Sequence, residues 1–167
     1  ERSLYLVLQI LEAKIPVIIA LNFIEEAERK GIKIDSEKLG KLLHIPTIPI
    51  NPLTKRGIDK LVSSLLRIKK EEKWFMVKYD DHIEKAIQKT SLQIKTTSVQ
   101  KRFISLRVLE GDEDFYRYLT DKKIIDKIKQ NIKDHPKIAE DISITRYGTA
   151  SLIAEKVINI TSLRIIK

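Results

Sequence analysis

Residues 15–27 read Ile-Pro-Val-Ile-Ile-Ala-Leu-Asn-Phe-Ile-Glu-Glu-Ala, and this stretch decides the fold class. Its apolar part, residues 16–21, is too short for a helix and is apolar on both faces, as a strand buried in a parallel sheet must be. Asn22 and Glu25 follow directly, at the edge where α/β sheets bind their ligands. The stretch therefore predicts a buried strand with a candidate binding edge behind it.

The segments around this strand alternate between helical and extended patterns. Apolar residues recur at helical spacing over residues 1–13, 35–43 and 58–66, a polar helix-prone segment covers 22–30, and a second short apolar run covers 47–50. This order is typical of a parallel α/β sheet. Two short parallel strands cannot cover their own edges, so we expect missing elements upstream. The absence of an initiator Met also indicates a piece of a longer protein.

The second half of the chain shows helical stripes alone. After the charged run 69–72, an apolar patch at Trp74 and Phe75 is expected to pack in the joint between two domains, against the helix of residues 58–68. Helices are then expected around four apolar stripes, in residues 83–94, 103–108, 124–132 and 138–160. We therefore expect an α/β domain over residues 1–72 and an all-α helical bundle over 73–167 that folds on its own.

Composition limits the possible function classes. The 167 residues include no Cys, which excludes disulfides, thiolate metal sites and Cys nucleophiles. The longest apolar stretch, residues 15–21, is far shorter than the roughly 20 residues that cross a bilayer. The net charge of +9 is spread along the chain without basic blocks or interleaved aromatics, so a nucleic-acid partner is not expected.

Asn22 and Glu25 carry the most specific chemistry in the sequence. An Asn amide can meet the N7 and O6 edge of guanine, while a carboxylate accepts from N1–H and the exocyclic amine. Adenine offers no such pair of donors to the carboxylate. The same two residues also suit a helix cap and a first-turn acid, and the pattern alone leaves this structural alternative open.

The segments 1–12, 15–22 and 25–35 closely resemble the GTPase domain of the ferrous iron transport protein B family. The base-specifying box of that family is Asn-x-x-Asp, so the resemblance gives Asn22 and Glu25 this role, with Glu in place of Asp. Residues 45–61 resemble the last strand, second base loop and final helix of the domain. Asn51 and Pro52 stand there for the usual Ser-Ala pair, and Pro52 has no N–H to offer guanine O6.

The resemblance continues through residues 79–87, 101–113 and 146–147 into the helical domain that follows the GTPase domain in this family. That domain is implied to favour the GDP-bound state and to join the GTPase domain to the membrane. The resemblance therefore implies a cytosolic region at the cytoplasmic face of the cell membrane. Its partners would be the upstream half of the GTPase domain and a downstream transmembrane domain, and a homo-oligomer is possible.

The sequence lacks the phosphate loop G-x-x-x-x-G-K-[ST], the switch threonine and the D-x-x-G motif, which this family carries upstream. GTP or GDP with Mg²⁺ is thus expected in the intact parent, with no tight binding to this chain alone. The upstream half is removed, disordered or degenerate. Asn22, Glu25, Asn51 and Pro52 are the expected guanine-site residues, and we assign no catalytic or metal residues.

Other charged residues have simpler interpretations. Glu110 and the acids over 112–114 surround a helix stop at Gly111 and lack the spacing of a Ca²⁺ loop. Three His residues are far apart in the sequence, and Asp80 and Asp81 suit a helix cap. A different class of function also stays open, a basic helical module on a vestigial α/β scaffold that binds nucleic acid or protein.

We predict that the 167-residue chain does not hydrolyse GTP. Phosphoryl transfer needs a Lys, backbone amides and Mg²⁺ around the phosphates, and the motif that supplies them is absent. Phosphate release should equal the buffer blank. Turnover that disappears when a residue within this chain is mutated would contradict the prediction.

Overall fold

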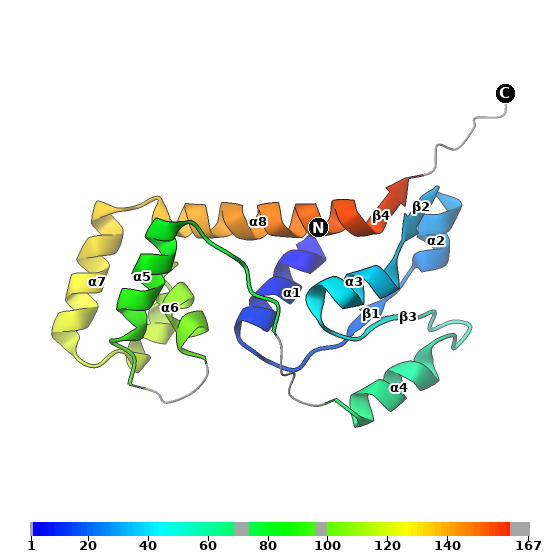
Figure 1. Ribbon diagram of the computed structural model, residues 1–167. Coiled ribbons are helices and arrows are strands. Elements are labelled where there is room, and N and C mark those ends of the chain that lie inside the picture. Colours follow the sequence, from blue (N-terminus) through cyan, green and yellow to red (C-terminus); the bar gives the residue numbers. More distant parts are fainter. Residues whose placement is uncertain (1, 69–73, 96–99, 161–167) are drawn as a thin grey trace.

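The computed structural model describes residues 2–68, 74–95 and 100–160 (Figure 1). The helices of the first part are α1 (Arg2–Glu12), α2 (Ile24–Arg29), α3 (Ser36–Leu43) and α4 (Ile58–Leu66). Those of the second part are α5 (Asp81–Ser91), α6 (Lys101–Leu109), the 3₁₀ helix η1 (Glu113–Tyr118), α7 (Lys122–Asp134) and α8 (Ile138–Val157). The strands are β1 (Ile19–Leu21), β2 (Ile32–Ile34), β3 (Thr47–Pro49) and β4 (Ile158–Ile160).

Strands β1 and β3 form the expected parallel pair. Their register places Ile19 opposite Thr47 and Leu21 opposite Pro49, so both carboxyl ends lie at the same edge. The α/β fold class of the first part, followed by a helical part, is confirmed. β1 is shorter than the 16–21 strand that the sequence predicts, because the ladder with β3 begins only at residue 19.

A second sheet, between β2 and β4, is absent from the sequence predictions. The two strands run antiparallel, with Ile32 opposite Ile160 and Ile34 opposite Ile158. The expectation of a helix through residue 160 is therefore wrong, because α8 ends at Val157 and the chain continues as a strand. This sheet ties the end of the helical part back to the first part, beside α2 (Figure 1).

The turns around the helices follow the sequence predictions with one exception. Asp35 caps α3, its carboxylate accepting a hydrogen bond from Lys38 N at 2.9 Å. Asp80 occupies the N-cap position of α5 but its side chain makes no capping bond. Instead the Glu84 carboxylate accepts from the backbone N of Tyr79 at 3.2 Å, which satisfies a donor just before the helix.

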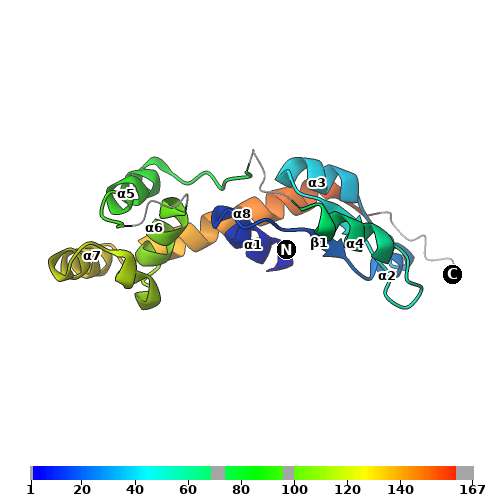
Figure 2. The same cartoon turned by 90° about the horizontal axis from the view of Figure 1, so that it is seen from below.

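The largest hydrophobic core is shared by both parts of the chain. It combines Leu8 and Leu43 of the first part with Ile83, Leu106 and Ile153 of the second. Helix α8 runs the length of the molecule, from α7 to the region of α3, and supplies this core along its whole length (Figures 1 and 2). The expectation that the helical part closes its core on itself is therefore wrong for the larger cluster.

A smaller core belongs to the helical part alone. It gathers buried side chains of α6, η1, α7 and the segment after α5, namely Ile94, Ile104, Val108, Tyr116, Leu119 and Ile128. The division of the chain at residues 72 and 73 stays a prediction, and the charged run on which it rests, 69–72, lies outside the described residues.

The joint between the two parts includes some of the expected residues. Trp74 and Phe75 are half-buried and pack against the shared core, as predicted. Helix α4 has no buried residue and contributes none of the side chains packed on this core. The expectation that residues 58–68 form part of the joint is therefore wrong, since α1, α3 and α8 take that place.

A buried ionic network lies where the parts meet. The Arg146 guanidinium of α8 lies 3.0 Å from Glu12 Oε2 and 2.7 Å from Glu110 Oε1, and it donates to Tyr5 Oη at 2.9 Å. Tyr79 donates its O–H to the other Glu12 oxygen. Burial would lower the pKa of Arg146, but Glu12 and Glu110 more than offset this and hold that pKa above its ordinary value. One cation thus joins α1, the C-terminal end of α6 and α8.

Arg146→Met should destabilise the fold by about 3–5 kcal/mol, because it leaves the Glu12 carboxylate buried without its partner. Urea unfolding measures the loss. Arg67→Met is the matched control, because Arg67 is exposed, and should change stability by less than about 0.5 kcal/mol. The double variant Glu12→Gln with Arg146→Met should lose less than the sum of its single changes. Equal losses from Arg146→Met and Arg67→Met would contradict this view of the network.

Candidate functional site

The candidate site lies at the common carboxyl edge of β1 and β3. The backbone N of Ile50 donates to Leu21 O at 2.8 Å, so the two strands stay paired up to the point where the loops leave. Asn22 directly follows β1, and Asn51 lies two residues after the end of β3. Ligands of open parallel sheets bind outside such an edge.

Asn22 is held in a sharp turn. Its Oδ1 accepts from the backbone N of Phe23 at 2.8 Å, and Phe23 adopts a left-handed conformation with φ 59° before α2 begins. A non-glycine residue at this φ is uncommon and marks a constrained turn. Because the amide oxygen of Asn22 is engaged, its NH₂ group is the part left to donate, which suits the two acceptors N7 and O6 of guanine.

Glu25 lies one turn later on α2 and is already paired. Arg56 Nη1 lies 3.3 Å from Glu25 Oε1. A hydrogen bond from its own backbone N–H, one from the Asn51 side chain and the Arg56 charge together hold the pKa of Glu25 below its ordinary value. The carboxylate is therefore ionised, as guanine recognition requires, but a bound base would share it with Arg56.

The loop after β3 uses its amides internally. Asn51 Oδ1 accepts from Leu53 N at 3.1 Å and from Thr54 N at 3.2 Å, while Asn51 N donates to Arg56 O at 2.9 Å. Pro52 is exposed and has no N–H. Every position from 51 to 54 thus has its backbone N–H engaged or missing, so none of these four residues offers a free backbone donor to guanine O6 in this conformation.

The structure brings three of the four sequence-predicted residues, Asn22, Glu25 and Asn51, to one edge of the sheet. Glu25, Asn51 and Arg56 are in mutual contact, and Asn22 lies three residues before Glu25 at the end of β1. Pro52 points no polar group into the site. Arg56 was missed by sequence reasoning, although a cation in the same loop as Asn51 was a signal that could have indicated a partner for Glu25.

The acidic residues near Gly111 have structural partners. Arg107 pairs with Glu110 at 2.9 Å and with Asp112, and Asp112 also caps η1 by accepting from Asp114 N at 3.2 Å. Lys129 of α7 lies 3.1 Å from Glu113. These contacts fasten α6, η1 and α7 together, and they agree with the structural interpretation of this segment.

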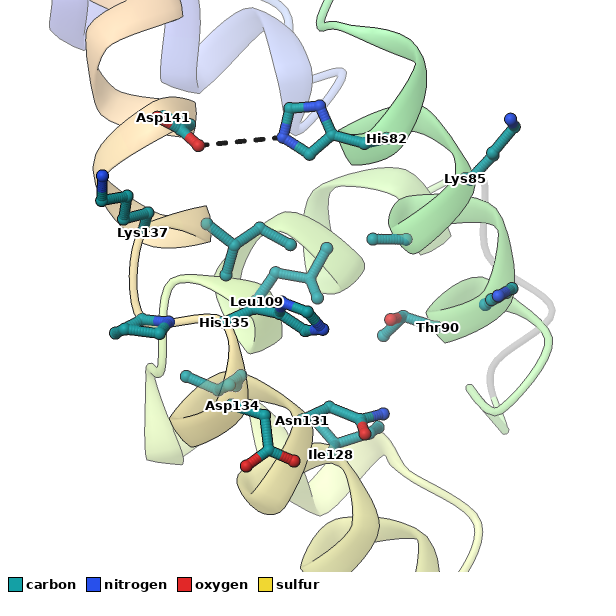
Figure 3. A pocket seen from close by; sticks show the side chains of 15 residues that line it. His82, Lys85, Thr90, Leu109, Ile128, Asn131, Asp134, His135, Lys137 and Asp141 are labelled. Atoms are coloured by element: carbon teal, nitrogen blue, oxygen red, sulfur yellow. Dashed lines mark ion pairs between the residues drawn. The ribbon is translucent and has the colours of Figure 1, made fainter.

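A cavity of about 830 Å³ lies between α5, α7 and α8 (Figure 3). His82 Nε2 lies 3.7 Å from Asp141 Oδ2 at one side of it, and His135 lines it from the end of α7. His44 instead ends α3 in a left-handed conformation. Within residues 2–68, 74–95 and 100–160, no three His, Asp or Glu side chains gather as metal ligands.

The chain matches two descriptions in comparisons with known families. Residues 1–65 match Ferrous iron transport protein B, and residues 79–159 match the FeoB cytosolic helical domain. The Fe(2+) transporter FeoB of Escherichia coli K12 is 36% identical over 119 residues, covering 67% of this chain and 15% of its own. A Porphyromonas gingivalis Fe(2+) transport protein A/FeoB fusion protein is 30% identical over 168 residues, covering 89% and 20%.

The fold has solved relatives too. A GDP-bound mutant of S. thermophilus NFeoB superimposes with a TM-score of 0.79 at 26% identity, covering 93% of this chain and 64% of that chain. Fold and site thus define part of a G domain continued by a helical domain. The chain belongs to the ferrous iron transport protein B family. It spans about a fifth or less of the curated relatives that it matches.

No helix among the described residues has the length and apolar character that crossing a membrane requires.

Gly57→Ala should destabilise the chain by more than about 3 kcal/mol. A Cβ at Gly57 would lie 2.1 Å from Pro49 O, and the φ of +77° adds the cost of a left-handed L-residue, roughly 1–2 kcal/mol. Gly111→Ala is the matched control, since Gly111 has a similar φ of +81° and no atom near its Cβ position. Thermal unfolding of both variants separates the cost of the steric clash from the cost of the left-handed backbone. An equal loss of stability in the two variants would contradict the close approach of Pro49 to Gly57.

Proposed function

We propose that this chain, together with residues upstream of it, is the regulatory cytosolic region of a Fe²⁺ transporter and passes the state of a bound guanine nucleotide toward the membrane. The family membership supports the general role, because the E. coli and P. gingivalis relatives are Fe²⁺ transporters. The observation that carries the coupling is the buried network of Arg146 with Glu12 and Glu110. An interaction module for nucleic acid is not favoured.

The route from the nucleotide edge to the helical part is short. Helix α1 ends at Glu12, inside the network, and a few residues later the chain enters β1, which ends beside Asn22. Arg146 then connects Glu12 to α6 and α8. A displacement at the edge that carries α1 along with β1 must also move Arg146 and α8 or break a buried ion pair, and the second option is costly.

The base-binding residues fit guanine only in part. Asn22 has donors free for N7 and O6, and the Glu25 carboxylate is the acceptor for N1–H and the amine. The described residues include none of the phosphate or Mg²⁺ ligands of the family's upstream motifs. We therefore assign this chain the recognition of the base and leave GTP hydrolysis to residues upstream.

Glu25→Asp should tighten GDP binding by roughly 3- to 10-fold in a protein extended upstream to a whole G domain. The change restores the family's Asn-x-x-Asp box, and the shorter side chain no longer reaches Arg56, so the carboxylate is free for the base. Titration calorimetry measures the change. Glu28→Asp is the matched control, since Glu28 is exposed on the same helix, and should leave the affinity unchanged. Unchanged or weaker GDP binding by Glu25→Asp would mean that Glu25 is a surface acid of the helix and does not contact the base.

Arg146→Lys should separate nucleotide binding from transport in the whole transporter. Lysine keeps the charge but cannot reach Glu12, Glu110 and Tyr5 together. We expect GDP affinity within about twofold of the parent and Fe²⁺ uptake reduced at least about fivefold, with Arg67→Lys unchanged in both. Fe²⁺ uptake equal to that of the parent, in an Arg146→Lys variant shown to be folded, would contradict the coupling role.

A further inference from the structure

Five exposed residues form a symmetric ridge along α8. Glu140, Ile144, Gly148, Leu152 and Lys156 follow one another at spacings of four residues, and all five are exposed. Residues spaced by four form one of the ridges by which helices pack against each other. In Figure 1, α8 lies along one side of the molecule, and no other described element covers its outer side.

The order of residue types along this ridge reads the same way from either end. Gly148 is at the centre, an aliphatic residue lies four positions to each side, and a charged residue lies eight positions to each side. The two charges are of opposite sign. Each step of four residues turns the ridge by about 40° around the helix, so the ridges of two copies lie along each other when the helices cross at about −50°. In that crossing, with the two-fold axis at Gly148, Ile144 lies against Leu152 of the copy and Glu140 comes near Lys156 of the copy, twice each.

The ridge carries apolar surface that the chain itself leaves uncovered. Ile144 is 59% exposed, Leu152 is 58% exposed, and the neighbouring Tyr147 is 47% exposed. Tyr147 stacks on Tyr5 of α1, with ring centroids 4.3 Å apart, and so holds a fixed aromatic surface beside the ridge. Such neighbouring apolar residues mark a contact surface when a partner of matching shape exists.

Gly148 makes a close crossing possible. A Cβ at this position would meet no atom of the described residues within 4 Å, so no contact among them requires glycine here. Glycine inside a helix costs about 1 kcal/mol relative to alanine. Axes that cross at roughly 8–10 Å place facing Cα atoms about 3.5–5.5 Å apart, because the Cα cylinder has a radius of about 2.3 Å.

We propose that a second copy of this chain packs antiparallel across α8, with its two-fold axis at Gly148. The charge pairing selects a copy of the same helix over an unrelated apolar partner, because Glu140 and Lys156 have no ion-pair partner among the described residues. Asp141 and Glu155 would face each other only if the helices ran nearly antiparallel without this tilt; the crossing of about −50° separates the two acids. Asp141 is also turned toward His82 of α5 (Figure 3). The contact is small, so the dimer is weak and concentration-dependent.

A cysteine at the axis tests the geometry. The chain has no native Cys, so Gly148→Cys adds the only thiol. The two Cα atoms at position 148 then lie within the roughly 4.4–6.8 Å that a disulfide needs, once the helices adjust to the new side chains. Under mild oxidation we expect covalent dimers at least tenfold faster than with Glu155→Cys, which is equally exposed but lies away from the axis. Equal rates for the two variants overturn the proposal.

Charge reversal provides a second test without covalent chemistry. Glu140→Lys and Lys156→Glu each bring like charges together, and each should weaken dimerisation by about 3- to 10-fold in sedimentation equilibrium of the 167-residue chain. The double variant restores both pairs and should regain the parent's affinity within about twofold. Circular dichroism verifies that the helices are intact. A double variant as weak as the singles, or a parent that stays monomeric at millimolar concentration, overturns the proposal.

Discussion

The Arg146 guanidinium, 1% exposed, holds together three helices that the chain reaches at widely separated positions. Burying one arginine and two carboxylates costs several kcal/mol per ion unless each is paired, so the helices must meet in one arrangement or leave a charge unsatisfied. Tyr5 and Tyr79 complete the hydrogen bonds around these charges. The network therefore fixes where α8 lies on α1, and the apolar side chains of the shared core fill the space that this placement defines.

The placement of α8 extends to both ends of the molecule. At one end the helix continues into β4, which pairs with β2 just after α2, the helix that bears Glu25. At the other end α8 lines the cavity beside α5 and α7. The long helix and β4 thus extend from β2, the strand that follows α2, to the far side of the helical part. Such a rigid element with a buried polar anchor is the kind of structure through which two sites influence each other.

The sequence predicted the elements that have strong local signals. The parallel pair β1–β3, the Asp35 cap and the Gly111 stop follow from apolar runs, capping chemistry and glycine φ, all of which are local properties. The antiparallel pair β2–β4 was missed because its three-residue strands are far apart in sequence and too short for a clear alternation. The shared core was missed because the apolar residues of α8 do not indicate which helices pack against them.

The guanine-binding role of Asn22, Glu25, Asn51 and Pro52 stays a prediction, and the structure adds contacts of these residues that the sequence did not indicate. Asn22 and Glu25 were proposed because an Asn and an acid after a buried strand can contact a guanine base. The pattern alone is weak, and the family resemblance supported it and named Asn51 and Pro52. The contact of Glu25 with Arg56 depends on how the loop after β3 folds back, which Gly57 decides through its close approach to Pro49. No periodicity in the sequence reports such a contact.

The central claim is that the nucleotide edge and α8 move as one unit through Arg146. Amide hydrogen exchange in the intact transporter, with and without GDP, tests it directly. The account predicts that GDP slows exchange both around Asn22 and along residues 142–157 of α8, and that Arg146→Lys keeps the first effect and abolishes the second. Slower exchange at the edge with α8 unchanged in the unmutated protein would contradict the account.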